Sequence, residues 1–350
     1  MSENQHSDDM QLTKETELPE KFDSVIKPWF KTKMTSGFWT LADGTSLHYR
    51  YAHHSAAKSI IVISSGRVEC AAKYAEIIYD LHQNGHSVFI HDHRGQGLST
   101  RLDENPHWGY VEDFNQYVSD FGSMIDDVLL PMLNENYVKA DHNATNTEAL
   151  MLNHALPPLH LLCHSMGSAI GVLLVKARPE LFAKAVFCSP MFGITPPLPP
   201  WIANFLVRLG VRFNKLRGKR TSYFFGQSDY SPTAFYKNRL MSSKLRYEIF
   251  RRTYAEQPEL QLGGVTYEWL NASLIAMKEI REQASKIEQP CLVLYSGADT
   301  VVANEDIEQV ISDFKHCEST LIPEALHELL FEKDKFRTPV LTKILSYFSP

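Results

Sequence analysis

The sequence has little cysteine, no long apolar run and no recognisable leader. Its five cysteines in 350 residues are scattered, with neither a CxxC pair nor Cys/His metal-ligand spacing. This excludes a disulfide framework and predicts reduced, mostly buried thiols in a cytoplasmic protein. No apolar stretch approaches the roughly 18 residues that suggest a membrane span. Residues 1–20 are polar and acidic and lack the basic and apolar regions of a signal peptide, so we expect none.

An excess of positive charge is also absent. The formal net charge is −6 at pH 7, so nucleic acid is not expected as a partner. What the chain does have is ordinary globular composition, with 44% hydrophobic and 22% charged residues. A chain of this length and composition can bury enough apolar surface for one large core and an inserted module.

Short β-branched runs alternate with helix-like segments along most of the chain. After a hairpin predicted around Asp43-Gly44, this alternation indicates a mostly parallel, doubly wound α/β sheet. The predicted strands cover residues 59–64, 87–91, 159–163, 185–188, 291–296 and 319–322, and the predicted helices cover 71–84, 113–133, 166–177 and 336–348, with one more around Ile307.

Two segments interrupt the alternation and set the expected domain boundaries. Residues 134–158 are polar, and we expect a surface loop insertion there. Residues 191–289 are rich in aromatics and helix formers and lack strand alternation, which predicts a helical cap between two core strands. The chain therefore divides into a solvated polar tail (1–22), a first core part (23–190), the cap (191–289) and a second core part (290–350).

The strongest chemical signal is a serine between a predicted strand and a predicted helix. Ser165 follows the apolar run 159–163, and Met166 and Gly167 come directly after it. A nucleophile elbow requires this strand–turn–helix context, so the pattern predicts an α/β-hydrolase fold with Ser165 as the nucleophile. Cys163 stands where the usual G-x-S-x-G pattern has glycine, and cysteine is also small. The alternative is that Ser165 only caps the helix.

A serine hydroxyl needs a base, and in this fold an acid and then a histidine follow the serine along the chain. Asp299 stands just after the strand 291–296, where the acid belongs, although it could also cap the next helix. His327 follows the strand 319–322 and precedes a helix, so we interpret it as the base rather than as an ordinary helix-start histidine. The other late histidine, His316, precedes that strand and lies at the wrong end of the sheet.

Ester hydrolysis at a serine also needs backbone N–H donors for the oxyanion. Met166, at the start of the predicted helix, is the first candidate donor. Arg67 is the second, because Gly66 beside it permits a close backbone approach in the loop after the strand 59–64. The alternative for this loop is a plain strand-to-helix turn. The chemistry requires neither a cofactor nor a metal, and we expect none.

Several motifs resemble the monoglyceride lipase and lysophospholipase branch of the α/β hydrolases. Residues 65–69 and the pair Lys73-Tyr74 look like that branch's H-G-x-x-E with its downstream basic–Tyr pair, except that Ser65 stands where histidine is frequent. Residues 92–99 match its D-x-R-G-x-G-x-S loop. Together with residues 262–269 and 325–330, these segments are most similar to the bacterial lysophospholipase L(2) family.

That resemblance implies hydrolysis of the single acyl ester of a lysophospholipid, giving a fatty acid and a glycerophosphodiester. It also implies peripheral contact with the cytoplasmic face of the inner membrane. A monoacylglycerol lipase or a general carboxylesterase is the nearest alternative, because either would share the triad. A non-catalytic binding protein that kept the fold is the alternative from another class.

Two features of the residues themselves suit a lipid substrate. Residues 201–209 place apolar side chains on one helical face, and basic residues follow at 212–220. This combination suits docking on an anionic membrane or a lid over an acyl chain, whereas the alternative is a cap helix packed on the core. The candidates for contacting a phosphate head group are Arg67, Arg94, Arg239 and Arg246.

Overall fold

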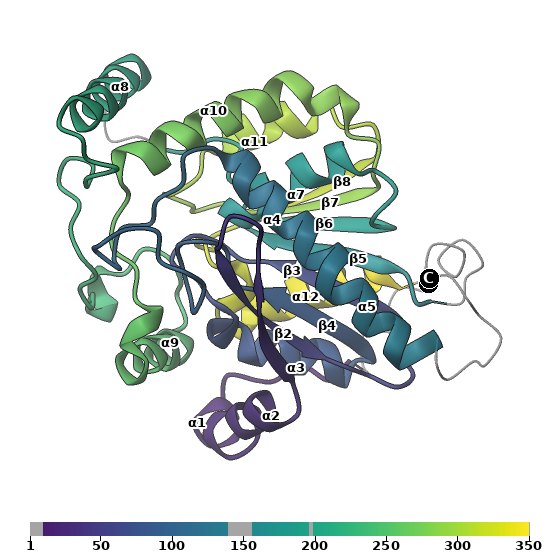
Figure 1. Cartoon of the computed structure of the whole chain (residues 1–350). Helices are drawn as coiled ribbons and strands as arrows, with labels where there is room; N and C mark the ends of the chain where they lie inside the picture. The colour runs from purple at the N-terminus through teal and green to yellow at the C-terminus, as the bar shows by residue number, and fades with distance from the viewer. Residues whose placement is uncertain (1–9, 139–155, 196–198, 350) are drawn as a thin grey trace.

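The computed structural model describes residues 10–138, 156–195 and 199–349, and eight strands form one sheet (Figure 1). The strand order is β1-β2-β4-β3-β5-β6-β7-β8. β2 is antiparallel to β1 and β4, and the other neighbours are parallel. The bounds are β1 (Thr35–Thr40), β2 (Ser46–Ala52), β3 (Ser59–Ser64), β4 (His86–His91), β5 (Leu159–His164), β6 (Lys184–Cys188), β7 (Cys291–Ser296) and β8 (Cys317–Ile322). The expected mostly parallel sheet and the hairpin at its edge are confirmed.

Helices cover both faces of the sheet. α3 (Ala75–Gln83) and α12 (Asp334–Phe348) pack on one face, and α4 (Phe114–Met124) and α7 (Met166–Ala177) pack on the other. β3 shows why: Ile60 and Val62 belong to one core, whereas Ile61 and Ile63 belong to the other. Successive strand residues point to opposite faces, so a central strand covered on both sides is apolar throughout.

The segment between β6 and β7 contains the helices that the composition predicted. They are α8 (Pro200–Leu216), α9 (Lys244–Glu256) and α10 (Tyr267–Gln283). Figure 1 shows α8 at an outer corner of the molecule, against one end of α10 and away from the sheet. α11 (Asn304–Ile311) follows β7. This arrangement places helical structure over the carboxyl ends of the central strands.

The N-terminal segment differs from the expected solvated tail. α1 (Leu18–Lys21), a π-helical turn (Phe22–Ile26) and α2 (Lys27–Thr32) follow one another, and Leu18 is fully buried together with Phe22, Ile26 and Phe30. These four apolar residues recur every fourth position, so they form a stripe that packs in the same core as α3 and α12. The expectation is therefore wrong for the described part of residues 1–22, which begins at residue 10.

The expected surface loop at 134–158 is also wrong at its beginning. A short helix, α5 (Leu130–Leu133), continues into a π-helical turn (Asn134–Val138), so the chain stays helical where the loop was predicted to start. The rest of that prediction, from 139 to 155, lies outside the described residues. Among the helices that the structure describes, none is both long and apolar enough to cross a membrane.

Candidate active site

Ser165 lies at a sharp turn between β5 and α7. Its backbone has φ 51° and ψ −117°, a positive φ that is unusual for a residue other than glycine. The Ser165 amide donates to the Cys188 carbonyl at 3.0 Å, and the Ser165 carbonyl accepts from Met191 at 3.1 Å, so β6 and the chain after it hold the turn. A Cβ atom at Gly167 would overlap the Ser64 carbonyl. The turn therefore depends on the small residue that the sequence places there.

The departure from the usual elbow pattern has a structural explanation. Cys163 is fully buried, and a Cβ atom at Gly171 on α7 would overlap its sulfur. Gly171 has no side chain, so the sulfur of Cys163 can occupy the space beside it. A cysteine at this position is compatible with the turn because the helix opposite has a glycine.

The three residues predicted to form a triad lie in hydrogen-bond contact. His327 Nε2 is 2.9 Å from Ser165 Oγ, and His327 Nδ1 is 2.8 Å from Asp299 Oδ2. An imidazole whose Nδ1–H donates to a carboxylate presents the Nε2 lone pair to the hydroxyl, which is the arrangement needed to accept its proton. Ser165 and His327 come together although 162 positions separate them in the chain.

Asp299 is held in its ionised form. Burial by itself would raise the pKa of this carboxyl, but the interaction with His327 and the hydrogen bonds from the amides of Val301 and Val302 together outweigh it, and the net result is a lowered pKa. The amides of Val301 and Val302 donate to the other carboxylate oxygen at 2.7 and 3.2 Å. Asp299 therefore also makes the turn contacts that a helix-capping residue would make, in addition to its contact with His327.

The predicted oxyanion donors border the same cavity. Met166 and Arg67 both line it beside Ser165, and neither of their amide N–H groups has an acceptor among the described residues. The Arg67 side chain donates to the carbonyls of Gly263 and Gly264 at 3.1 and 2.7 Å. It therefore connects residues 65–69, the loop with the predicted oxyanion donor Arg67 (the oxyanion loop), to the segment before α10. Burial lowers the pKa of Arg67 to about 10, because a guanidinium without a carboxylate partner loses hydration there.

Glu69 stabilises the oxyanion loop through hydrogen bonds. Its Oε2 atom accepts from the Gly66 amide and from the Tyr74 hydroxyl, the latter at 2.6 Å. Gln96 donates to the Gly66 and Glu69 carbonyls at 2.8 and 3.1 Å. These contacts give physical roles to Glu69, Tyr74 and Gln96, three residues of the motifs at 65–74 and 92–99.

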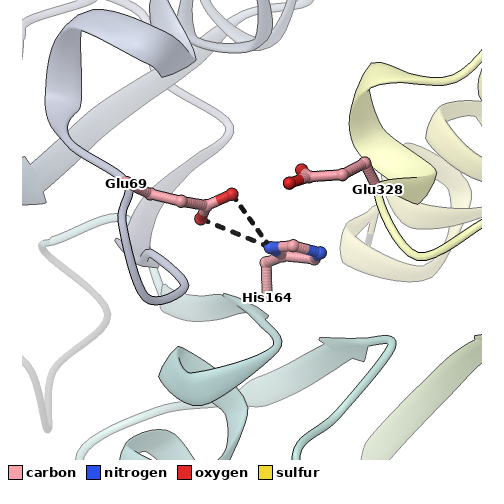
Figure 2. A group of neighbouring side chains, drawn as sticks. All are labelled: Glu69, His164 and Glu328. Carbon is pink, nitrogen blue, oxygen red and sulfur yellow. Dashed lines mark hydrogen bonds and ion pairs between the residues drawn. The ribbon is translucent and has the colours of Figure 1, made fainter. Parts of the chain in front are cut away.

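Glu69, His164 and Glu328 lie close together (Figure 2), and His164 directly precedes Ser165 in the chain. Lys73 Nζ lies 2.5 Å from Glu69 and 2.8 Å from Glu328, and His164 Nδ1 lies 3.3 Å from Glu69. Three side chains that could bind a metal converge here, but Lys73 pairs with both carboxylates and His164 pairs with Glu69, so the cluster is a buried salt-bridge network. It joins Glu69 to the chain neighbours of Ser165 and His327, because His164 precedes Ser165 and Glu328 follows His327.

The charges in this network support one another. Burial would raise the pKa of Glu69, but Lys73 and His164 hold it well below the usual value. Burial would lower the pKa of Lys73 and of His164, but the carboxylates of Glu328 and Glu69 raise both. The sequence analysis missed this network. The only local signal for it is the four-residue spacing of Glu69 and Lys73, and the remaining partners come from distant strands and loops.

Two of the four proposed head-group arginines border the cavity, namely Arg67 and Arg239. Arg94 is instead buried in a bidentate pair with Asp120, at 2.5 and 2.6 Å. Arg246 is buried against Glu76 and Asp334, at distances of 2.9–3.2 Å. The expected phosphate contact is therefore wrong for Arg94 and Arg246, because their donors are already used inside the fold.

The cavity above Ser165 measures about 1310 Å³. Its apolar lining comes largely from α8, α10 and the segments beside them, with Val207, Leu270, Leu274 and Met277 among the contributors. Ser165, Met166 and His327 also line it. The space is large enough for a substrate with a long apolar part, and the reactive hydroxyl is accessible from it.

The fold is that of the α/β hydrolases, with serine, histidine and aspartate side chains arranged at the carboxyl ends of its strands. The model of the family described as serine aminopeptidase, S33, matches residues 55–334. The chain is 30% identical to lysophospholipase L2 from Escherichia coli, over 87% of this chain and 83% of that relative. It is also 30% identical to the probable lysophospholipase L2 from Haemophilus influenzae, over 83% of each chain.

A solved structure agrees with this classification at the level of the fold. The soluble variant of monoglyceride lipase from Saccharomyces cerevisiae, solved with a substrate analogue, matches with a TM-score of 0.65. The match covers 91% of this chain and 95% of that chain, at 16% identity. The protein belongs to the serine aminopeptidase S33 family of hydrolases.

Proposed function

We propose that this protein is a serine hydrolase that cleaves the acyl ester of a lysophospholipid to a free fatty acid and a glycerophosphodiester. The observation that carries the proposal is the hydrogen-bond chain from Asp299 through His327 to Ser165 at the floor of a large, partly apolar cavity. The names of the two bacterial relatives support the choice of substrate. Monoacylglycerol is the alternative substrate, because the same triad would cleave its ester.

The proposed reaction passes through an acyl-enzyme. His327 takes the hydroxyl proton as Ser165 Oγ attacks the ester carbonyl carbon, and Asp299 stabilises the imidazolium. The amides of Met166 and Arg67 donate to the oxyanion of the tetrahedral intermediate. When that intermediate collapses, His327 protonates the leaving alcohol. A water molecule, deprotonated by His327, then attacks the acyl carbon and releases the fatty acid.

We also propose that α8 rests on a membrane surface. Trp201, Phe205, Leu209 and Phe213 recur every fourth residue along α8, and Trp201 is 73% exposed. A basic segment follows at 212–220. An exposed apolar stripe beside basic residues suits an anionic lipid surface. This favours the membrane-docking interpretation of the stripe over a helix packed on the core, and the cytoplasmic face of the inner membrane is the proposed location.

Replacing the nucleophile tests the proposed function. In Ser165→Ala, kcat for a lysophospholipid and for a short chromogenic ester should fall by about 10⁶-fold, as when the nucleophile of a serine triad is removed. Ser168→Ala is the matched control, because Ser168 is also buried near the start of α7 and its hydroxyl has no hydrogen-bond partner among the described residues. A fluorophosphonate probe should label the control and leave Ser165→Ala unlabelled. Comparable turnover in the two variants would refute the assignment.

A further inference from the structure

Several cationic side chains line the cavity, and three of them come from neighbouring segments of the chain. Lys237, Arg239 and Arg251 line the cavity and come from α9 and the segment before it. Among the described residues, no carboxylate lies within ion-pair distance of these three side chains. The carboxylates that line the cavity have other partners: Glu69 and Glu328 pair with Lys73, Asp306 pairs with Arg281, and Asp229 accepts from Asn105 and Tyr223.

Arg251 is the best fixed of the three cations. Its Nη1 donates to the Tyr230 hydroxyl at 3.1 Å, and its Nη2 donates to the Ser231 carbonyl at 3.3 Å. The guanidinium lies 5.2–5.5 Å from the ring centres of Tyr230, Tyr247 and Phe250. Its Nε atom is buried and has no hydrogen-bond partner in the described part of the chain. The Arg251 side chain is therefore fixed in position, but its Nε–H group has no acceptor and its charge has no carboxylate partner among the described residues.

These three cations lie on the side of Ser165 where His327 is found. The Glu328 amide, next to His327, donates to the carbonyl of Leu240 at 2.8 Å, and Leu240 directly follows Arg239. Lys73, which binds the Glu328 carboxylate of Figure 2, lies 5.1 Å from the Phe250 ring that Arg251 also contacts. Because the histidine protonates the leaving oxygen, the alcohol part of the substrate must occupy this side.

We infer that Lys237, Arg239 and Arg251 form a subsite for the phosphodiester of the leaving alcohol, and that Arg251 is its fixed centre. The inference rests on the proposed function and deepens it, because it assigns the choice between a charged and an uncharged glycerol ester to named side chains. A phosphodiester beside the leaving oxygen supplies the negative charge and the acceptors that these three cations lack. A monoacylglycerol would leave them unpaired.

The test compares two substrates that differ only in the head group. Lysophosphatidylethanolamine and monoacylglycerol with the same short acyl chain are used as monomers, so that α8 meets no lipid surface. In Arg251→Gln, kcat/KM for the phospholipid should fall about 10- to 100-fold, the range expected for a hydrogen bond to a charged group. The value for monoacylglycerol should change less than about threefold. Arg239→Gln should show a smaller loss with the same selectivity.

Two arginines provide comparisons. Arg252→Gln is the matched control, since Arg252 neighbours Arg251 on α9 but pairs with Asp23 at 2.9 Å and does not line the cavity. It should leave both substrates unaffected. Arg208, on α8, lines the cavity without an ion-pair partner among the described residues. If Arg208→Gln gives the selective loss and Arg251→Gln does not, the subsite lies elsewhere and the inference is overturned.

The remaining outcomes are equally decisive. Equal losses on both substrates in Arg251→Gln would mean that Arg251 only supports the fold. Inhibition of chromogenic-ester turnover by inorganic phosphate but not by glycerophosphoethanolamine would indicate a general anion site. Either result overturns the subsite while leaving the proposed hydrolase intact. If the wild-type protein turns over neither lipid, the proposed function itself fails.

Discussion

Acid should destabilise this protein strongly, because four buried histidines are held neutral. Burial lowers the pKa of His86, His93 and His160 to about 4, and burial with the neighbouring His93 lowers that of His91 well below its usual value. All four side chains are at most 2% exposed. In the unfolded chain the same groups titrate near their ordinary value of about 6.5.

The sign and size of the effect follow from that difference. Below pH 6.5 the unfolded chain binds more protons than the folded one, so stability falls as the pH drops from about 6.5 to about 4. Each histidine with a pKa of about 4 costs about 2 kcal/mol at pH 5 and about 3 kcal/mol at pH 4. Three of them remove roughly 6 kcal/mol by pH 5, a large part of the roughly 5–15 kcal/mol typical of a folded protein.

His164 acts in the opposite direction. Burial would lower its pKa, but Glu69 and Glu328 raise it above the unfolded value. Its contribution to stability is therefore fully present below about pH 6.5 and is lost as the pH rises through its folded pKa. One group of this sign offsets only part of the loss from four groups of the other sign, so the net effect of acid remains destabilising.

Urea unfolding followed by circular dichroism at pH 7.5, 6 and 5 measures the effect. The decisive variant is His91→Phe, because both ring nitrogens of His91 are buried without a partner in the described structure and the ring packs on Phe121. Its loss of stability between pH 7.5 and pH 5 should be smaller than that of the wild type, because the variant has one fewer histidine that must stay neutral in the folded state. Replacing the exposed His316 by Gln should change nothing. Equal stability at pH 7.5 and pH 5 would refute the reasoning.

Two further predictions concern the network around Lys73 and the helix at the corner of the molecule. Lys73→Met removes the cation that pairs with both Glu69 and Glu328 and should lower the free energy of unfolding by about 3–5 kcal/mol. Lys73→Arg keeps the charge and should lose less stability, and urea titration at pH 7.5 distinguishes the two variants. Trp201→Ser with Phe205→Ser should reduce sedimentation with anionic vesicles at least about tenfold while kcat on a soluble ester stays unchanged. Undiminished vesicle binding would contradict the assigned role of α8.

The sheet and the triad positions could be predicted because their signals are local. The runs at 59–64, 159–163 and 291–296 are apolar because both faces of those strands are covered, and each coincides with a strand or falls one residue short of it. Ser165, Asp299 and His327 each follow a strand directly or after a short loop. Parallel strands bring their carboxyl ends to one edge, so three separate local patterns were sufficient to predict one site.

The N-terminal helix and the buried network could not be predicted in the same way. Leu18, Phe22, Ile26 and Phe30 are spaced as on a helix face, but the surrounding residues are polar and charged, so composition favoured a tail. The partners that make the stripe stable are α3 and α12, which lie far along the chain. Glu328 likewise pairs with Lys73, which lies 255 positions away in the sequence. The N-terminal helix and the buried network both depend on contacts between segments far apart in the chain, and local patterns in a single sequence do not reveal such contacts.

The arginines show most clearly what determines the role of a charged side chain here. Arg94, Arg239 and Arg246 were equivalent candidates for a head-group contact, yet Asp120 binds Arg94, and Glu76 with Asp334 binds Arg246. A buried guanidinium must be neutralised or hydrogen-bonded, and the fold itself does this for those two. Arg239 and Arg251 line a cavity where the carboxylates are already paired with other groups. Their charge is therefore available to a substrate, and the loss of selectivity in Arg251→Gln measures how much of it a substrate uses.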